Sequence, residues 1–173
     1  MMRRRKLNRL HDYDYSQTGW YFVTICTRNR EEFFGEIKNQ EMVFNERAWI
    51  VKKQWLWLAC QYKGIKLDQF IIMPNHIHGI VVINSRDRSR PVPTNPRPVP
   101  TVKTKSLSGL MGAFKTTSSK LIHQQGFEYF AWQRSFCDHI IRNEKSLYNI
   151  RQYIIDNPLK WQVDRNNQEN LYY

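Results

Sequence analysis

The chain has 173 residues, 41% of them hydrophobic and 14% aromatic, which is enough apolar material for the core of one compact domain. Its 27 Lys and Arg against 15 Asp and Glu give a net charge of +12, which favours a polyanionic partner, nucleic acid first. No apolar run approaches the roughly 20 residues of a membrane span, and the three widely spaced cysteines fit neither a disulfide framework nor a zinc site. We therefore expect a cytoplasmic protein with reduced thiols and no secretory signal; a basic protein without a polyanionic partner is the alternative.

The first elements are predicted from periodicity and turn chemistry within a single domain over residues 1–173. A basic arm over residues 1–18 precedes a strand from Trp20 to about Thr27, which is rich in aromatic and β-branched residues. A hairpin with its turn near residues 38–40 comes next. Asn45 is suited to cap a helix over residues 46–62, where apolar side chains recur at helical spacing.

Two further strands are expected in "IKLDQFIIM" and "HIHGIVVI", joined by a turn at Pro74–Asn75. Residues 84–105 then hold five of the seven prolines and repeat the pentapeptide RPVPT, which predicts an exposed internal linker. A helix over residues 106–126, a short strand near 136–140 and a helix ended by Pro158 complete the chain. Segregated antiparallel strands with a few packing helices indicate the α+β class.

Two histidines stand at the start of a predicted strand, and this pair is the most informative feature of the sequence. Residues i and i+2 of a strand project from the same face, so His76 and His78 point the same way. Two imidazoles held like this can bind a metal ion, and two hydrogen-bonded core histidines are the alternative. A metal held by only two imidazoles needs oxygen ligands as well, which suits Mn²⁺ or Mg²⁺ with phosphate completing the shell.

The last predicted helix carries a second group of polar residues. Tyr153 and Asn157 are four positions apart and therefore share one edge of its apolar stripe, whereas Tyr148 falls on the opposite edge. Arg151 lies inside the apolar sector, so it needs a partner or a phosphate. If this edge faces the histidines, the phenol is a candidate nucleophile and the amide oxygen a candidate third ligand. A boundary tyrosine beside a helix-terminal asparagine is the simpler interpretation.

Four segments together are similar to a known family. The segment "MPNHIHGIVV", followed far downstream by "YIIDNPLKW", resembles the single-tyrosine HUH transposases, and most closely the REP-associated tyrosine transposases of bacterial chromosomes. "GWYFVTICTRNR" and "WQRSFCDHIIRNE" fit the same family, so the resemblance runs from about Gly19 to Trp161. It implies a ferredoxin-like antiparallel sheet with helices packed on one face, in agreement with the α+β class predicted above.

The resemblance also implies a chemistry. His76 and His78 would be metal ligands for Mg²⁺ or Mn²⁺, Asn157 the third ligand and Tyr153 the nucleophile. The implied activity is cleavage and rejoining of single-stranded DNA at hairpin elements through a 5′-phosphotyrosine intermediate. The family implies a bacterial, nucleoid-associated protein with no membrane. The linker leaves open whether the tyrosine helix packs on its own sheet or on a partner's, and so both a monomer and a homodimer remain open.

Basic and aromatic residues outside this group are candidate contacts to DNA phosphates and bases. Trp132, beside Arg134, could stack on a base, although core packing is the alternative. The full set of candidates is Arg3, Arg4, Arg5, Lys6, Lys103, Lys105, Lys115, Lys120, Trp132 and Arg134.

Two rival functions remain open. One is a non-catalytic regulatory protein that binds hairpin DNA with the same fold. The other is a plasmid-type nicking enzyme, which usually has a larger chain with further modules.

Overall fold

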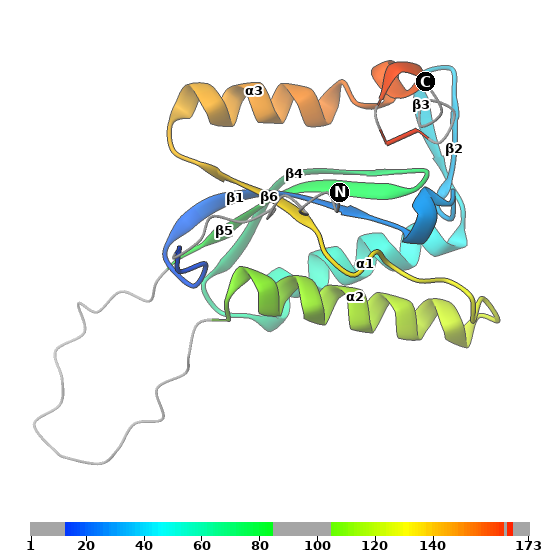
Figure 1. The fold of residues 1–173 in the computed structure, drawn as a ribbon, viewed down its shortest axis with the longest axis horizontal. Helices are drawn as coiled ribbons and strands as arrows, with labels where there is room; N and C mark the ends of the chain where they lie inside the picture. The colour runs from blue at the N-terminus through cyan, green and yellow to red at the C-terminus, as the bar shows by residue number, and fades with distance from the viewer. Residues whose placement is uncertain (1–12, 85–104, 165, 168–173) are drawn as a thin grey trace, which may run out of the picture.

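The computed structural model describes residues 13–84, 105–164 and 166–167 (Figure 1). The linker prediction, apart from its two end residues, lies outside these ranges, and so do residues 1–12 of the predicted arm. Residues 13–18 are no arm, because Tyr13 and Tyr15 pack against the core and the carbonyl of Tyr15 accepts a hydrogen bond from the amide of Leu107. None of the described helices is long and apolar enough to cross a bilayer.

The elements match the predicted order closely. They are β1 (Gly19–Cys26), the 3-10 turn η1 (Arg28–Arg30), β2 (Gly35–Lys38), β3 (Glu41–Phe44), α1 (Glu46–Gln61), β4 (Ile65–Met73), β5 (His76–Ile83), α2 (Leu107–Gln124), β6 (Cys137–Ile141), α3 (Glu144–Ile155) and the 3-10 turn η2 (Pro158–Val163). Asn45 caps α1 as predicted, since its side-chain oxygen accepts a hydrogen bond from the amide of Ala48 at 3.1 Å. α3 ends at Ile155, and η2 carries the chain onward from Pro158.

The main sheet has four antiparallel strands in the order β4-β5-β1-β6, and β2 and β3 form a separate hairpin. β5 and β1 are its central strands, and every residue of β5 is buried. Their register places Thr24 opposite His78 and Cys26 opposite His76. The two histidines are thus fixed between neighbouring strands on both sides, at one end of the sheet.

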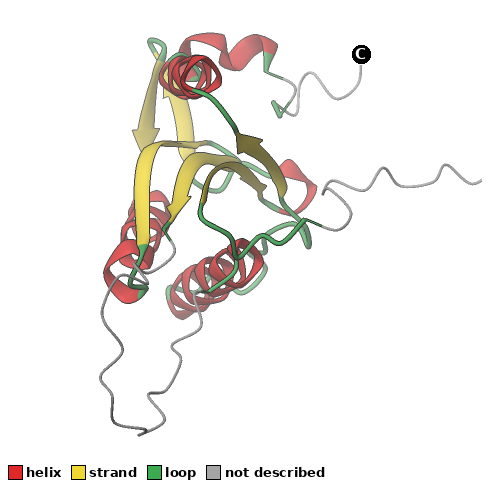
Figure 2. Ribbon diagram, turned by 90° about the vertical axis from the view of Figure 1, so that its left-hand side faces the viewer, coloured by secondary structure: helices red, strands yellow, loops and turns green. Residues whose placement is uncertain are grey.

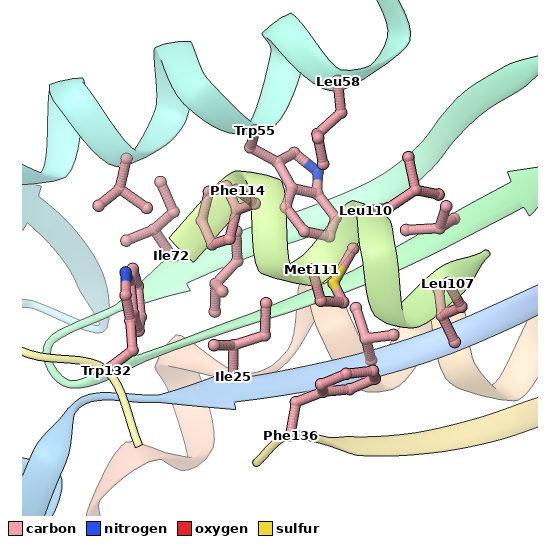
Figure 3. Close-up of a cluster of buried hydrophobic side chains, with 14 of the residues drawn as sticks. Ile25, Trp55, Leu58, Ile72, Leu107, Leu110, Met111, Phe114, Trp132 and Phe136 are labelled. Atoms are coloured by element: carbon pink, nitrogen blue, oxygen red, sulfur yellow. The ribbon is translucent and has the colours of Figure 1, made fainter. Parts of the chain in front are cut away.

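One face of the sheet packs on α1 and α2 and holds most of the hydrophobic core (Figure 3). Side chains alternate along β5, so Ile77 and Val81 point into this layer together with Trp55 and Phe114 of the two helices. Gly79 lies between them, and a Cβ there would come within 2.4 Å of the Trp55 ring. The glycine is needed because the indole of Trp55 occupies the space where a side chain would stand.

The third helix covers the opposite face of the sheet, as both views show (Figures 1 and 2). The fold class is confirmed, but the expectation of helices on one face holds for α1 and α2 and not for α3. The alternation of β5 explains the difference, because His76, His78 and Ile80 point away from the main core and need a cover. Ile80, Ile141 and Ile154 form a second, smaller core beneath α3.

Candidate active site

The two histidines lie side by side beneath α3. The Nε2 atoms of His76 and His78 are 3.0 Å apart, and both side chains are 0% exposed. Trp161 of η2 covers His76, with ring centroids 5.9 Å apart, and Phe22 of β1 stacks on His78 at 5.4 Å. The strand therefore presents both imidazoles to one point, as the spacing of the residues predicts.

The tautomer of His76 is set by Asn75, the residue before it. The Asn75 side-chain Nδ2 donates to the carbonyl oxygens of Arg30 and Asn166, both at 2.8 Å. Carbonyls only accept, so the amide orientation is determined and its Oδ1 must face the Nδ1 of His76, 2.8 Å away. His76 then carries its proton on Nδ1 and directs the lone pair of Nε2 toward His78, as a metal ligand requires.

His78 has an equivalent support from Thr24 on the neighbouring strand. Its Nδ1 lies 2.8 Å from the hydroxyl oxygen of Thr24, which can accept or donate. When Thr24 accepts, His78 also directs an Nε2 lone pair toward His76. The two Nε2 lone pairs would repel each other at this separation unless a cation binds both, so this tautomer suits a metal-bound state. In the absence of a cation, a proton on His78 Nε2 forms a hydrogen bond to His76 Nε2.

A carboxylate completes the group. Ligand atoms of His76, His78 and Asp164 all lie within 4.8 Å of one another, and Asp164 is buried. η2 brings Asp164 to the histidines, and Asp164 Oδ1 is held by the amide of Asn166 at 2.6 Å. No pattern in the sequence points to Asp164, because it lies past the helix that Pro158 ends and belongs to no periodic segment.

Asn157, the predicted third ligand, lies beside this carboxylate. Its Nδ2 is 3.4 Å from Asp164 Oδ2, and the whole side chain is buried. Its Oδ1 is buried without a hydrogen-bond partner among the described residues. A buried amide oxygen in this state is costly unless something binds it. Two imidazole nitrogens, a carboxylate and this oxygen make a mixed nitrogen and oxygen donor set, which fits Mn²⁺ or Mg²⁺.

Tyr153 lies directly beside the histidines. Its phenol oxygen is 3.3 Å from His78 Nε2, and its ring packs against Phe22 and His78. Tyr148 is 63% exposed and faces away from this site. Arg151 has its partner in Asp68 of β4, with the Nε and Nη2 atoms 2.7 and 2.6 Å from the two carboxylate oxygens. α3 is therefore held on the sheet of its own chain with Tyr153 turned inward.

An open cleft of about 800 Å³ runs along α3 and η2, and Tyr153 lies in its wall. Side chains of α3 and η2 line one side, and Phe22 of β1 and His139 of β6 line the other. Tyr153, Asn157 and Asp164 all contribute to its wall. The cleft therefore gives solvent a path to the buried group.

Comparison with known proteins agrees with this geometry. No family model matches the sequence. An uncharacterised protein of Haemophilus influenzae is 34% identical over 165 residues, covering 93% of this chain and 92% of its own, so the two proteins belong to one family. A second protein of that organism, provisionally named a REP-associated tyrosine transposase, is 25% identical over 85% of this chain and 74% of its own.

A solved structure described as a REP-associated tyrosine transposase bound to a REP hairpin superposes with a TM-score of 0.60. The match covers 88% of this chain and 73% of that one at 19% identity. The chain has the REP-associated tyrosine transposase fold. The expected resemblance is thus confirmed, and the transposase fold extends over almost the whole chain.

The structure separates the basic residues among the predicted DNA contacts into three groups. Arg3, Arg4, Arg5, Lys6 and Lys103 lie outside the described residues. Lys105 is hydrogen-bonded to the phenol of Tyr62 at 2.7 Å, and Lys115 donates to the carbonyls of Gln133 and Ser135, so both have structural roles within the helical layer. Lys120 and Arg134 are exposed and keep their status as candidates.

The prediction that Trp132 stacks on a DNA base is wrong. The indole is only 7% exposed, its Nε1 donates to the hydroxyl of Ser118 at 3.0 Å, and its ring packs between Phe34, Phe114 and Phe130. Its face is covered on the side of the sheet opposite the histidines, so it cannot stack on a DNA base. Trp132 instead packs in the hydrophobic core, which was the alternative interpretation.

Proposed function

We propose that this chain is a metal-dependent transposase that cleaves and rejoins single-stranded DNA at hairpin elements through Tyr153. The observation that carries the proposal is the position of the Tyr153 phenol, 3.3 Å from a histidine of the buried His76, His78 and Asp164 group. The fold supports it, since the structural relative is described as bound to a REP hairpin. Asn157 is proposed as a further oxygen ligand, because its Oδ1 is buried and no described residue forms a hydrogen bond to it.

The residues suit a transesterification. A divalent ion held by His76, His78 and Asp164 would polarise the scissile phosphate as a Lewis acid. The Tyr153 oxygen forms a bond to phosphorus and gives its proton to water of the cleft. The bond from phosphorus to the 3′ oxygen breaks, and that oxygen takes a proton from the same water and leaves as a hydroxyl. One ester is exchanged for another, so a second 3′ hydroxyl can reverse the step and join strands without ATP.

A regulatory hairpin-binding protein with the same fold is the second candidate. A covalent trap separates the two functions. The protein is incubated with hairpin DNA carrying single-stranded flanks and Mn²⁺ and then run on a denaturing gel. A covalent protein–DNA band is expected for the wild type, and a shift seen only on native gels would support the binding protein.

Two tyrosines of α3 give a matched pair of variants for this assay. Tyr153→Phe removes one oxygen and little volume, so the adduct should disappear while hairpin binding survives. Tyr148→Phe should form the adduct at the wild-type level, because Tyr148 is exposed on the far side of the helix. Loss of the adduct in Tyr148→Phe alone would refute the assignment of Tyr153.

A further inference from the structure

The route by which a phosphate can reach the site is restricted. His76 and His78 are fully buried by the sheet below, Trp161 beside them and Phe22 above His78. The reactive side chains meet solvent at the cleft, which Tyr153, Asn157 and Asp164 line. A strand that presents its phosphate to Tyr153 must therefore place its adjoining nucleotides in this cleft.

The cleft has the size and shape for such nucleotides. Its volume of about 800 Å³ lies in the upper part of the range for ligand-binding clefts, and it is open to solvent. The wall on α3 includes Ser146, Asn149 and Tyr153, which follow one another at helical spacing on one edge. By helical rise, Ser146 lies about 10 Å along the axis from Tyr153, so the cleft extends well past the reacting phenol.

The chemistry of the lining suits nucleic acid. Phe22 and Ile150 supply apolar surface, and His139, the β6 residue paired with Phe22, is exposed beside them. Lys145 adds positive charge, whereas Lys160 is paired with Asp156 at 3.3 Å. Asp164 of the candidate metal site is the single acidic residue among the described lining residues. Base faces can pack on aromatic rings, amides can bond to base edges, and lysines can neutralise phosphates.

We propose that this cleft binds the unpaired nucleotides adjoining the scissile phosphate, and that Asn149 contributes to the choice of base. The inference rests on the proposed function, because it takes Tyr153 as the point of attack. Asn149 is exposed, lies one helical turn from Tyr153 and lines the cleft, so its amide can both donate to and accept from a base edge. Base readout would then depend on a neutral side chain, and Lys145 would add affinity without sequence preference.

The test is a binding experiment that needs no chemistry. A fluorescent random-sequence single-stranded DNA library is titrated with protein in EDTA, and bound molecules are selected and sequenced. Wild type should enrich a short unpaired motif. Asn149→Ala should lose this enrichment and bind the selected motif about tenfold more weakly. Gln152→Ala is the matched control, because Gln152 is an exposed amide on α3 that does not line the cleft.

A second variant, Lys145→Ala, tests the contribution of positive charge and should weaken binding to all single strands alike. Lys53 is an exposed lysine of α1 on the other side of the sheet, so Lys53→Ala should leave binding unchanged. If Asn149→Ala and Lys145→Ala bind like the wild type while the Tyr153 adduct still forms, the cleft assignment is refuted and the proposed function stands. If they lose binding but no adduct forms with any DNA, the cleft binds single strands, but the enzyme proposal fails and with it the assignment of these nucleotides to a scissile phosphate. Equal binding of blunt duplex and single strands would overturn the cleft assignment.

Discussion

Two neighbouring residues could supply the oxygen ligand of the candidate metal site at His76 and His78. Asp164 offers a charged oxygen close to both histidines, and Asn157 offers a neutral one that is buried with no hydrogen-bond partner among the described residues. A carboxylate binds a divalent cation more strongly than an amide does, and so we expect Asp164 to contribute more.

We predict that calorimetry with Mn²⁺ will order the variants by ligand strength. His76→Ala should reduce affinity by well over tenfold, because few protein side chains hold the ion. Asp164→Ala should lose more affinity than Asn157→Ala, and Tyr148→Phe should bind like the wild type. Unchanged binding in His76→Ala would place the metal elsewhere.

Asn75 supports the candidate metal site indirectly, because its Oδ1 accepts the Nδ1 proton of the proposed ligand His76. Outer partners of ligating histidines typically contribute about ten- to a hundredfold to metal affinity. Asn75→Ala should therefore weaken Mn²⁺ binding by about tenfold or more, as measured by calorimetry. Asn75→Asp keeps an acceptor for His76 but loses both Nδ2 donors, so it should retain more affinity than Asn75→Ala. If both variants lose affinity equally, Asn75 acts by holding the backbone of Arg30 and Asn166 instead.

α3 is fastened to the sheet by an ion pair as well as by its apolar stripe. The Arg151 guanidinium donates two hydrogen bonds to Asp68 and thereby holds the pKa of that carboxyl below its ordinary value of 3.8. A carboxyl with a lowered pKa in the folded state stabilises the protein above pH 4, and this contribution is lost as the pH falls through the folded pKa. The Arg151 side chain is 41% exposed, so solvent screens the pair and its contribution is about 1 kcal/mol at most.

Asp68→Asn should accordingly lower the free energy of unfolding at pH 7 by up to about 1 kcal/mol. The difference from the wild type should shrink as the pH falls below 4 and through the lowered pKa of the folded carboxyl. Urea denaturation at pH 7 and pH 3 measures both values. Glu36→Gln serves as the control, since its ion pair with Lys38 is more exposed and should contribute less at either pH.

The elements themselves were predictable because their signals are local. The cap at Asn45, the Pro74–Asn75 turn and the spacing of His76 and His78 all act within a few residues. What could not be predicted depends on contacts far apart in sequence. Arg151 meets Asp68 83 residues away, and Trp132 packs against Phe34 and Phe114 on two distant segments. Asp164 reaches the histidines only because η2 turns back over them.

At the scale of the whole molecule, charge is the dominant property. A net charge of +12 should make binding to single-stranded or hairpin DNA fall steeply with salt, because neutralised phosphates release condensed counterions. Fluorescence anisotropy across a salt series gives the slope of log affinity against log salt. Lys145→Ala should make that slope shallower by about one. A wild-type slope near zero would mean that the charge has another purpose.

The sheet divides the molecule into two layers, and this division affects which part unfolds locally. The layer of α1 and α2 contains the large core, whereas three buried residues, Ile80, Ile141 and Ile154, form the core beneath α3. Local opening costs less where fewer apolar contacts must be broken. Amide hydrogens of α3 should therefore exchange with deuterium through partial opening, while those of β5 and α1 exchange only when the whole protein unfolds. The helix that carries Tyr153 should then lose its protection against hydrogen exchange while the sheet and the α1 and α2 layer remain folded.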